Sequence, residues 1–221
     1  MGKGPEDLRW KRLRSEHIVQ DEWIDFRREA YEFPDGSVFE PYYTYSRRSY
    51  VVIAASDTEG RFLCVRQFRQ GIQEVTTEFP AGGIELHSNR EYIVTRPEQD
   101  ENGASWNIQI GYDPQKPDLA ETALDAARRE LQEETGYSSD DWEHLITIPS
   151  NATMADNYAY VYRAKNCVKV GDQDLDPMEF LGVQLLEEKE VEDLIYSGRF
   201  QQAVHVMAFL LAKEKDAKKR C

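Results

Sequence analysis

The chain has 221 residues, of which 40% are hydrophobic and 31% charged, a balance typical of globular rather than disordered proteins. Its formal net charge of −14 disfavours non-specific binding to nucleic acid, which depends on basic surface. An anionic substrate would be repelled as well, unless cations or local arginines intervene.

The sequence contains no stretch that approaches roughly 18 consecutive apolar residues, so we expect no membrane span. Residues 1–17 lack the apolar core of a secretory signal. The three cysteines, Cys64, Cys167 and Cys221, are scattered and odd in number, which favours a reducing compartment without disulfides. We therefore expect a cytoplasmic protein that binds neither membranes nor nucleic acid.

The N-terminal third reads as a mixed polar start followed by strands. Residues 1–20 combine basic and acidic side chains and predict a frayed start or a short helix. Strands are predicted up to Tyr50, broken by a turn at Phe33–Gly36, where Pro and Gly occupy turn positions. The apolar runs Tyr50–Ala55 and Phe62–Val65, joined by a short polar turn, predict a hairpin.

The middle of the chain holds a glycine turn, a polar segment and a helix. "TTEFPAGGIEL" predicts a strand ending in Pro80–Gly83, where glycines allow a sharp turn or a close approach to a ligand. Residues 87–117 are polar, with two short β-type runs, and predict an inserted hairpin. Residues 118–137 predict the strongest helix, with Gly136 as its C-terminal stop.

The C-terminal part predicts further strands and two helices. "HLITIPS" and "YAYVYRA" read as strands, an acidic loop leads into a third strand, and Gly198 separates the two helices. Mixed strands with few helices predict an α/β (α+β) fold in one domain, with the N-terminal strands as a possible subdomain.

The predicted central helix crowds three glutamates, Glu130, Glu133 and Glu134, into five residues. At about 100° per residue they fall within an arc of roughly 100° beside the apolar stripe of the helix. Hard oxygen donors that converge in this way are what a Mg²⁺-type ion requires. The alternative is a solvated acidic face, in which Arg129 pairs with Glu133 one turn later.

The segment "ETALDAARRELQEETGY" resembles the Nudix box, G-x5-E-x7-R-E-U-x-E-E-x-G-U, in which U is bulky and apolar. Eight of its nine fixed positions match, namely Glu121, Arg129, Glu130, Leu131, Glu133, Glu134, Gly136 and Tyr137. The ninth, a glycine six residues before Glu121, is replaced by Gln115. We expect Gly82 or Gly83 to take its place, with the 87–117 hairpin inserted in the first loop of the box.

The resemblance extends beyond the box, over about residues 20 to 212. "VRQFRQGIQEVTTEFPAGGIE" is similar to the strand-and-turn segment of the ADP-sugar (ADP-ribose) diphosphatase branch. It implies a Nudix-type α/β/α sandwich around a mixed sheet, with an N-terminal β subdomain. We expect residues 1–48 to form a β segment that makes a homodimer, and residues 49–221 to form the hydrolase domain with its insertion.

The implied activity is Mg²⁺-dependent, or Mn²⁺-dependent, hydrolysis of the diphosphate bond in a nucleoside diphosphate sugar. By resemblance, Glu130, Glu133 and Glu134 are catalytic metal ligands, and a backbone carbonyl at Ala81 or Gly82 completes the set. Arg129 is expected to hold these glutamates in place through Glu133 or through Glu121 at the start of the box.

Substrate contacts are implied for two arginines, one tryptophan and the glycine turn. Arg69 matches an arginine that the branch uses on the substrate phosphates, with Arg66 as a weaker candidate. The alternative for Arg69 is an ordinary surface arginine. Trp23 lies where the branch often places an aromatic side chain that stacks on the base, although a core tryptophan is equally compatible with the sequence. Gly82 and Gly83 are expected beside the substrate.

The general base is expected in the acidic loop before the last strand. Glu179 is the first choice, with Asp174 and Asp176 behind it, and the alternative is a solvated loop without a catalytic role. Nothing in the sequence assigns a role to His144 or His205. His205 lies within an apolar helix and predicts a packed or partly exposed side chain.

One departure from the branch bears on substrate choice. "PSNATMADNYAY" stands where many ADP-ribose hydrolases carry a Ser-Pro-Gly turn, so ADP-ribose is one candidate among nucleotide sugars. Other candidates are dinucleoside polyphosphates and coenzymes. Two different classes remain, a sensor that binds a nucleotide sugar without cutting it and a scaffold without a site, and the complete set of box glutamates disfavours both.

Overall fold

The computed structural model describes residues 8–21, 23–85 and 121–219, and these form two compact units. The described part of the first unit comprises residues 8–48, except residue 22, and 151–157. The second comprises 49–85, 121–150 and 158–219. The hairpin predicted at 87–117 lies outside the described residues.

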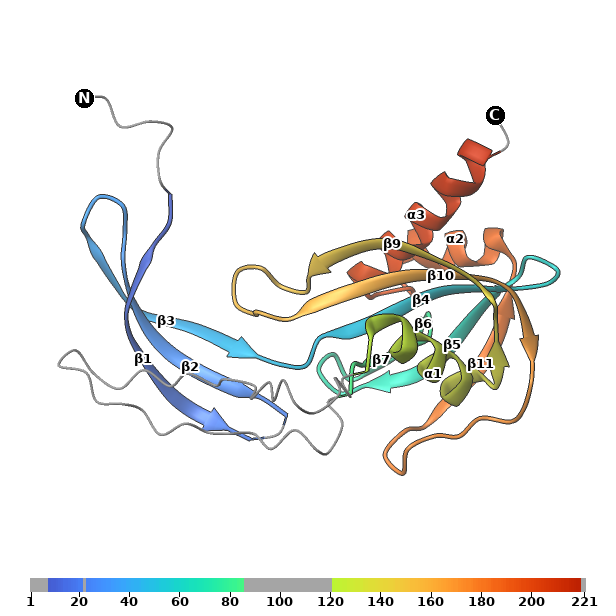
Figure 1. Ribbon diagram of the computed structural model, residues 1–221, viewed down its shortest axis with the longest axis horizontal. Coiled ribbons are helices and arrows are strands. Elements are labelled where there is room, and N and C mark those ends of the chain that lie inside the picture. Colours follow the sequence, from blue (N-terminus) through green and yellow to red (C-terminus); the bar gives the residue numbers. More distant parts are fainter. Residues whose placement is uncertain (1–7, 22, 86–120, 220–221) are drawn as a thin grey trace, which may run out of the picture. The chain divides into compact units, whose positions relative to one another are not determined.

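The first unit is an antiparallel sheet of β1 (Lys11–Gln20), β2 (Asp25–Glu32) and β3 (Val38–Ser46), in that spatial order (Figure 1). Residues 151–157 join it through the Tyr45 N–H, which donates to the Met154 carbonyl at 2.7 Å. The turn predicted at Phe33–Gly36 is confirmed, since Gly36 has a φ of 85° and its N–H donates to the Phe33 carbonyl.

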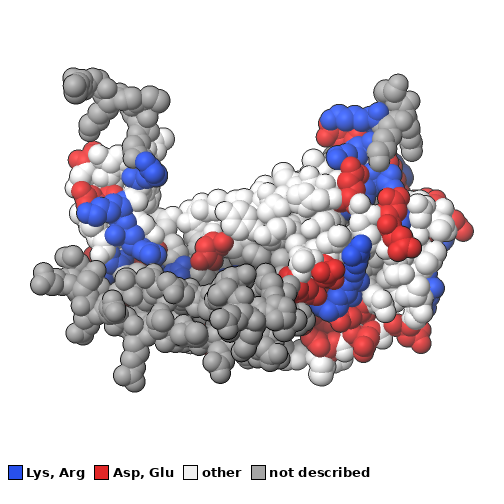
Figure 2. Space-filling view, viewed as in Figure 1, with Lys and Arg blue, Asp and Glu red and all other residues white. Residues whose placement is uncertain are grey.

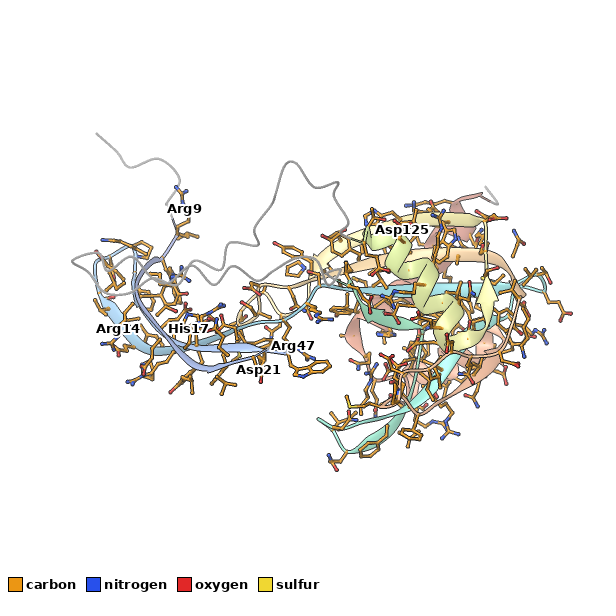
Figure 3. All side chains as sticks on the ribbon, turned by 60° about the horizontal axis from the view of Figure 1, so that its bottom comes forward. Arg9, Arg14, His17, Asp21, Arg47 and Asp125 are labelled. Carbon is orange, nitrogen blue, oxygen red and sulfur yellow. The ribbon has the colours of Figure 1, made fainter. Side chains whose placement is uncertain are left out.

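The prediction of a frayed start or short helix is wrong for residues 11–20, which form β1. Figure 3 shows Arg14 and His17 on this strand. Its half-buried side chains, Ser15 and His17, are both polar. Ser15 donates to Glu29 at 3.1 Å, and His17 lies 2.6 Å from Asp25. A strand that faces its neighbours with polar groups lacks the apolar alternation by which strands are recognised in a sequence.

The second unit is built on a mixed sheet with the strand order β11-β5-β4-β10-β8. In addition, β6 pairs with β5, β7 with β4, and β9 with β10. Only β4 and β10 run parallel among the described pairs. The strands are β4 (Tyr50–Asp57), β5 (Phe62–Arg69), β6 (Glu74–Glu78), β7 (Ala81–Gly83), β8 (Tyr137–Ser138), β9 (Asp141–Pro149), β10 (Tyr158–Lys169) and β11 (Leu181–Leu186).

Three helices cover the two faces of this sheet, namely α1 (Ala123–Thr135), α2 (Glu188–Tyr196) and α3 (Ala203–Lys219) (Figure 1). Successive residues of β4 point to opposite faces. Accordingly Val51 and Ile53 pack in the cluster that contains α1, whereas Val52 and Ala54 pack in the cluster that contains α2 and α3. The predicted α/β/α sandwich around a mixed sheet is therefore confirmed.

The helix α1 ends at the predicted stop, Gly136, but it begins at Ala123, within the predicted range of 118–137. The Thr122 hydroxyl accepts the Asp125 N–H at 3.1 Å as an N-cap. Gly136 ends the helix in the left-handed conformation, with a φ of 73°. A side chain there would also meet the Gly171 carbonyl oxygen at 2.3 Å, so only glycine fits.

Two further expectations concern the described residues only. Cys64 and Cys167 are both free and buried, which agrees with the prediction of a chain without disulfides. None of the helices that the structure describes has the length and apolarity that a membrane crossing requires.

Candidate functional site

The glutamates of α1 differ sharply in burial. Glu130 is 7% exposed and Glu134 is 3% exposed, whereas Glu133 is partly exposed. A solvated acidic face is therefore excluded for Glu130 and Glu134. Figure 2 shows that charges of both signs do mix on the outer surface around α1, where Arg128 lies 3.6 Å from Asp125. Asp125 marks the first turn of this helix in Figure 3.

Arg129 connects the carboxylates of the box. Its Nη1 donates to Glu130 Oε1 and to Glu133 Oε2, each at 2.8 Å. Its Nε donates to Glu121 Oε1 at 2.8 Å, and its Nη2 donates to the Gly83 carbonyl at 2.9 Å. Burial opposes the charge of Arg129, but these carboxylates outweigh it and raise the pKa of the guanidinium above its ordinary value.

The turn at β7 contacts the same helix through its backbone. The Ala81 N–H donates to Glu134 Oε2 at 2.9 Å. Gly82 lies against Glu130 so closely that a Cβ would stand 2.0 Å from its carboxyl carbon. Gly82 and Gly83 thus both contact the helix, Gly82 through its close approach to Glu130 and Gly83 through its carbonyl. The Glu85 N–H in turn donates to Glu121 Oε2 at 2.8 Å.

Burial raises the pKa of Glu130 to about 7, and repulsion from Glu133 and Glu179 adds to this rise. Burial also raises the pKa of Glu134 well above its usual range, with further repulsion from Glu130 and Glu179. Crowded carboxylates of this kind are stabilised by a cation, and their hard oxygens suit a divalent ion such as Mg²⁺. The donor set therefore fits such an ion.

In the described segments no three metal-binding side chains come together as a ready metal site. The hydrogen bonds of the site give the reason. Arg129 holds one oxygen each of Glu130 and Glu133, and the Ala81 N–H holds one oxygen of Glu134. Glu130 and Glu133 thus meet at Arg129 Nη1, whereas Glu134 is bonded to the turn at β7.

The acidic loop between β10 and β11 is attached to the C-terminal end of α1. Gln173 Nε2 donates to the Glu134 carbonyl at 2.7 Å, and the Asp174 N–H donates to the Glu133 carbonyl at 2.9 Å. Glu179 accepts the Asp176 N–H at 3.1 Å. The loop brings Glu179 near enough to Glu130 and Glu134 to raise the pKa of both.

Arg69 is not an ordinary surface arginine. Its Nε donates to Glu78 Oε1 at 2.9 Å, and its Nη2 also bonds to this carboxylate. Burial acts against the charge of Glu78, yet the hydrogen bonds from Arg69 and Thr76 lower its pKa below the ordinary value. Glu134 helps to stabilise the charge of Arg69, which connects this pair electrostatically with α1.

Comparison with known proteins decides the family. The model of the NUDIX domain matches residues 46–206 of this chain. The chain belongs to the Nudix family.

Two full-length relatives resemble this Nudix chain. An ADP-ribose pyrophosphatase of Bacillus subtilis (strain 168) is 26% identical over 96% of this chain and 97% of its own length. A methanol dehydrogenase activator of Bacillus methanolicus is 26% identical over 99% of both chains. A crystal structure of an ADP compounds hydrolase covers 95% of each chain with a TM-score of 0.69 and 17% identity, which supports the fold. The predicted Nudix hydrolase membership is confirmed.

Two buried groups of the Nudix domain were not assigned a role from the sequence. Glu78 is fully buried in β6, and the only signal was a charged residue placed directly before "FPAGG" in a strand. His205 of α3 is 4% exposed, and its Nδ1 accepts the Phe79 N–H at 3.1 Å. Burial lowers the pKa of His205 to about 4, so the ring is neutral at pH 7.

Other predicted residues are not brought to the box by any described contact. Arg66 is exposed and, three residues before Arg69 in β5, points to the other face of the sheet. Trp23 lies in the first unit, where its N–H donates to Asp21, and it is 60% exposed, so the core alternative is wrong. His144 is exposed and bonds to Thr147.

Proposed function

We propose that this Nudix protein hydrolyses the diphosphate bond of a nucleoside diphosphate sugar of the ADP-ribose type. The products are a nucleoside monophosphate and a sugar phosphate. One observation carries the proposal, namely that buried Glu130 and Glu134 share one helix with Glu133 and lie near Glu179, with Arg129 bonded to two of them. The full-length similarity to an ADP-ribose pyrophosphatase supports this choice of substrate.

The metal ligands are proposed to be Glu130, Glu133, Glu134 and the Ala81 carbonyl, which together suit Mg²⁺ or Mn²⁺. When bound, the ion neutralises diphosphate charge and lowers the pKa of a bound water. The role of Arg129 is to fix the orientation of the carboxylates, since it bonds to Glu121, Glu130 and Glu133 at once.

Glu179 is the proposed general base. Its carboxylate accepts a proton from the water that attacks phosphorus, while the bond from phosphorus to the bridging oxygen breaks. The bonds of its loop to the carbonyls of Glu133 and Glu134 keep this carboxylate beside the helix. Asp174 and Asp176 are exposed on the same loop and remain the second choices.

Substrate binding is proposed to use Arg69 on the phosphate oxygens, because a planar guanidinium matches such oxygens in geometry and charge. Gly82 and Gly83 are proposed to lie beside the diphosphate, and Arg66, which points to the other face of the sheet, remains the weaker candidate for a phosphate contact. Trp23 is proposed to stack on the base, and its exposure supports an intermolecular or ligand contact.

The first unit supports the proposed homodimer. Large apolar side chains of residues 8–48 remain exposed, which is typical of a surface that a partner covers. They are Leu8, Trp10, Leu13, Ile18, Val19, Trp23, Val38, Phe39 and Tyr43. Light scattering coupled to gel filtration is expected to give twice the chain mass, and a monomer at micromolar concentration would refute the dimer.

A substrate panel tests the activity. The protein is incubated with Mg²⁺ and ADP-ribose, ADP-glucose, GDP-mannose, UDP-glucose or diadenosine polyphosphates, and nucleoside monophosphate release is measured. We expect cleavage of an ADP-sugar, with a loss of at least about 100-fold in kcat in Glu133→Gln. Glu214→Gln is the matched control, because Glu214 is an exposed helical glutamate paired with Lys218. Tight binding without turnover would instead identify a sensor.

A second candidate function is activation of a dehydrogenase, and the similarity to the methanol dehydrogenase activator over 99% of both chains favours it. The test measures the rate of a methanol dehydrogenase with and without the protein. Stimulation that Glu133→Gln abolishes would join both functions in one site. Stimulation that survives this substitution would separate them.

A further inference from the structure

Glu78 is a buried charge outside the box, and the proposed chemistry does not use it. Its side chain is fully inaccessible to solvent. A carboxylate in such a place is strongly disfavoured unless cations and hydrogen bonds compensate for the lost water. The groups that stabilise the Glu78 carboxylate therefore indicate which side chain it acts on.

Arg69 is the main group that stabilises the buried Glu78 carboxylate. Nε of Arg69 lies 2.9 Å from Oε1 and 3.2 Å from Oε2 of Glu78, and Nη2 closes the second bond of a bidentate pair. The Thr76 hydroxyl also donates to this carboxylate. Two fixed contacts between planar groups restrict both the position and the plane of a guanidinium.

The backbone around Glu78 is fixed as well. The next residue, Phe79, donates its N–H to the buried His205 of α3. Three residues after Glu78, the Ala81 N–H donates to Glu134 of α1. The backbone that follows Glu78 is therefore bonded to α3 at Phe79 and to α1 at Ala81, on opposite faces of the sheet.

Arg69 itself is only partly buried, with 32% of its side chain exposed. A guanidinium that is bonded to Glu78 through one edge can still donate to an anion through its other N–H groups.

We propose that Glu78 is a positioning residue for substrate binding, because it orients the Arg69 guanidinium toward the diphosphate of the substrate. The inference rests on the proposed function. Glu78 touches neither the substrate nor the metal and acts only through Arg69. A purely structural ion pair would stabilise the fold without affecting affinity for the substrate.

The test measures ADP-ribose affinity by calorimetry in EDTA, where no metal-dependent turnover occurs, and KM and kcat with Mg²⁺. The variants are Glu78→Gln, Arg69→Gln and the double variant. Glu78→Gln is expected to raise the dissociation constant and KM about 10- to 100-fold, since a charge-assisted contact is loosened. The double variant is expected to bind no more weakly than Arg69→Gln.

The control is Asp57→Asn. Asp57 is a buried carboxylate that Arg61 binds at 2.9 and 2.7 Å on the same hairpin, at the end remote from Arg69. This variant is expected to lower stability while KM remains at the wild-type value. Comparing KM of Asp57→Asn with KM of Glu78→Gln therefore distinguishes the general effect of losing a buried ion pair from a specific effect on substrate binding.

The outcomes separate the two proposals. If Glu78→Gln binds ADP-ribose as the wild type does, the positioning role is overturned. If the wild type binds ADP-ribose but does not cleave it with Mg²⁺, the proposed hydrolysis fails and the affinity comparison still decides the role of Glu78. If the wild type does not bind ADP-ribose at all, the positioning role is overturned together with the substrate.

Discussion

Protonation of His205 is expected to destabilise the protein in mildly acidic solution. The ring is buried, and its Nδ1 carries no proton because it accepts the Phe79 N–H. Burial and the nearby Arg69 lower its pKa from 6.5 to about 4, although Glu78 acts in the opposite direction. The folded state therefore binds a proton less readily than the unfolded state between these two values.

The magnitude follows from linkage. A group whose pKa is lowered in the folded state loses stability as the pH falls below its unfolded pKa, by about 1.4 kcal/mol per pH unit. Over the full interval from 6.5 to 4 the loss is about 3 kcal/mol, and from pH 7 to pH 5 it is about 2 kcal/mol. Above pH 7 both states hold a neutral ring, and His205 has no further effect.

Urea unfolding at pH 7 and pH 5, in EDTA, measures this difference. His205→Asn keeps an oxygen that can accept the Phe79 N–H but does not titrate. Its stability is expected to fall about 2 kcal/mol less than that of the wild type between the two pH values. His144→Asn is the matched control, since His144 is exposed. Equal losses for wild type and His205→Asn would refute the assignment of the neutral ring.

Further predictions concern the box and its partners. Arg69→Gln is expected to lower the free energy of unfolding in urea by about 3 to 5 kcal/mol, because buried Glu78 loses its cation. Adding Glu78→Gln should restore much of this loss, and a double variant as unstable as Arg69→Gln would contradict the reasoning. Gly82→Ala should lower kcat at least tenfold, because the added Cβ would stand 2.0 Å from the Glu130 carboxyl carbon; Gly71→Ala is the control, since a Cβ there meets nothing within 4 Å. Mg²⁺ at about 100 times its Kd should stabilise the folded protein by about 2.7 kcal/mol, which thermal unfolding measures as a rise in Tm. An equal rise in Tm for Glu133→Gln would refute the proposed metal ligands.

The box helix could be predicted from the sequence because its determinants are local. Glutamate spacing, the Thr122 cap and Gly136 all lie within one short segment. The hairpin of β4 and β5 is predictable for the same reason, since both strands contain apolar runs and are joined by a short turn. In these elements the local pattern and the tertiary packing agree.

The rest depends on contacts between distant segments. The sequence does not predict β1 at residues 11–20, because this strand meets its neighbour through Ser15 and His17 rather than through apolar side chains. The sequence does not predict the buried bond from the Phe79 N–H to His205, because the two residues are more than a hundred positions apart. The sequence suggested Glu179 only by resemblance, since its place depends on bonds between its loop and the end of α1.

The hydrogen bond from the Glu85 N–H to Glu121 joins two parts of the chain that are far apart in the sequence. It ties together the two points at which the chain leaves the glycine turn and returns to the box helix. The geometry of the glutamates is set by Arg129, Gly82 and Ala81, on either side of that junction. The contacts that orient the box glutamates therefore come from two stretches of sequence, the glycine turn up to Glu85 and the helix that follows Glu121. Residues far apart along the chain act here as one structural unit, because Glu85 and Glu121 are bonded directly to each other.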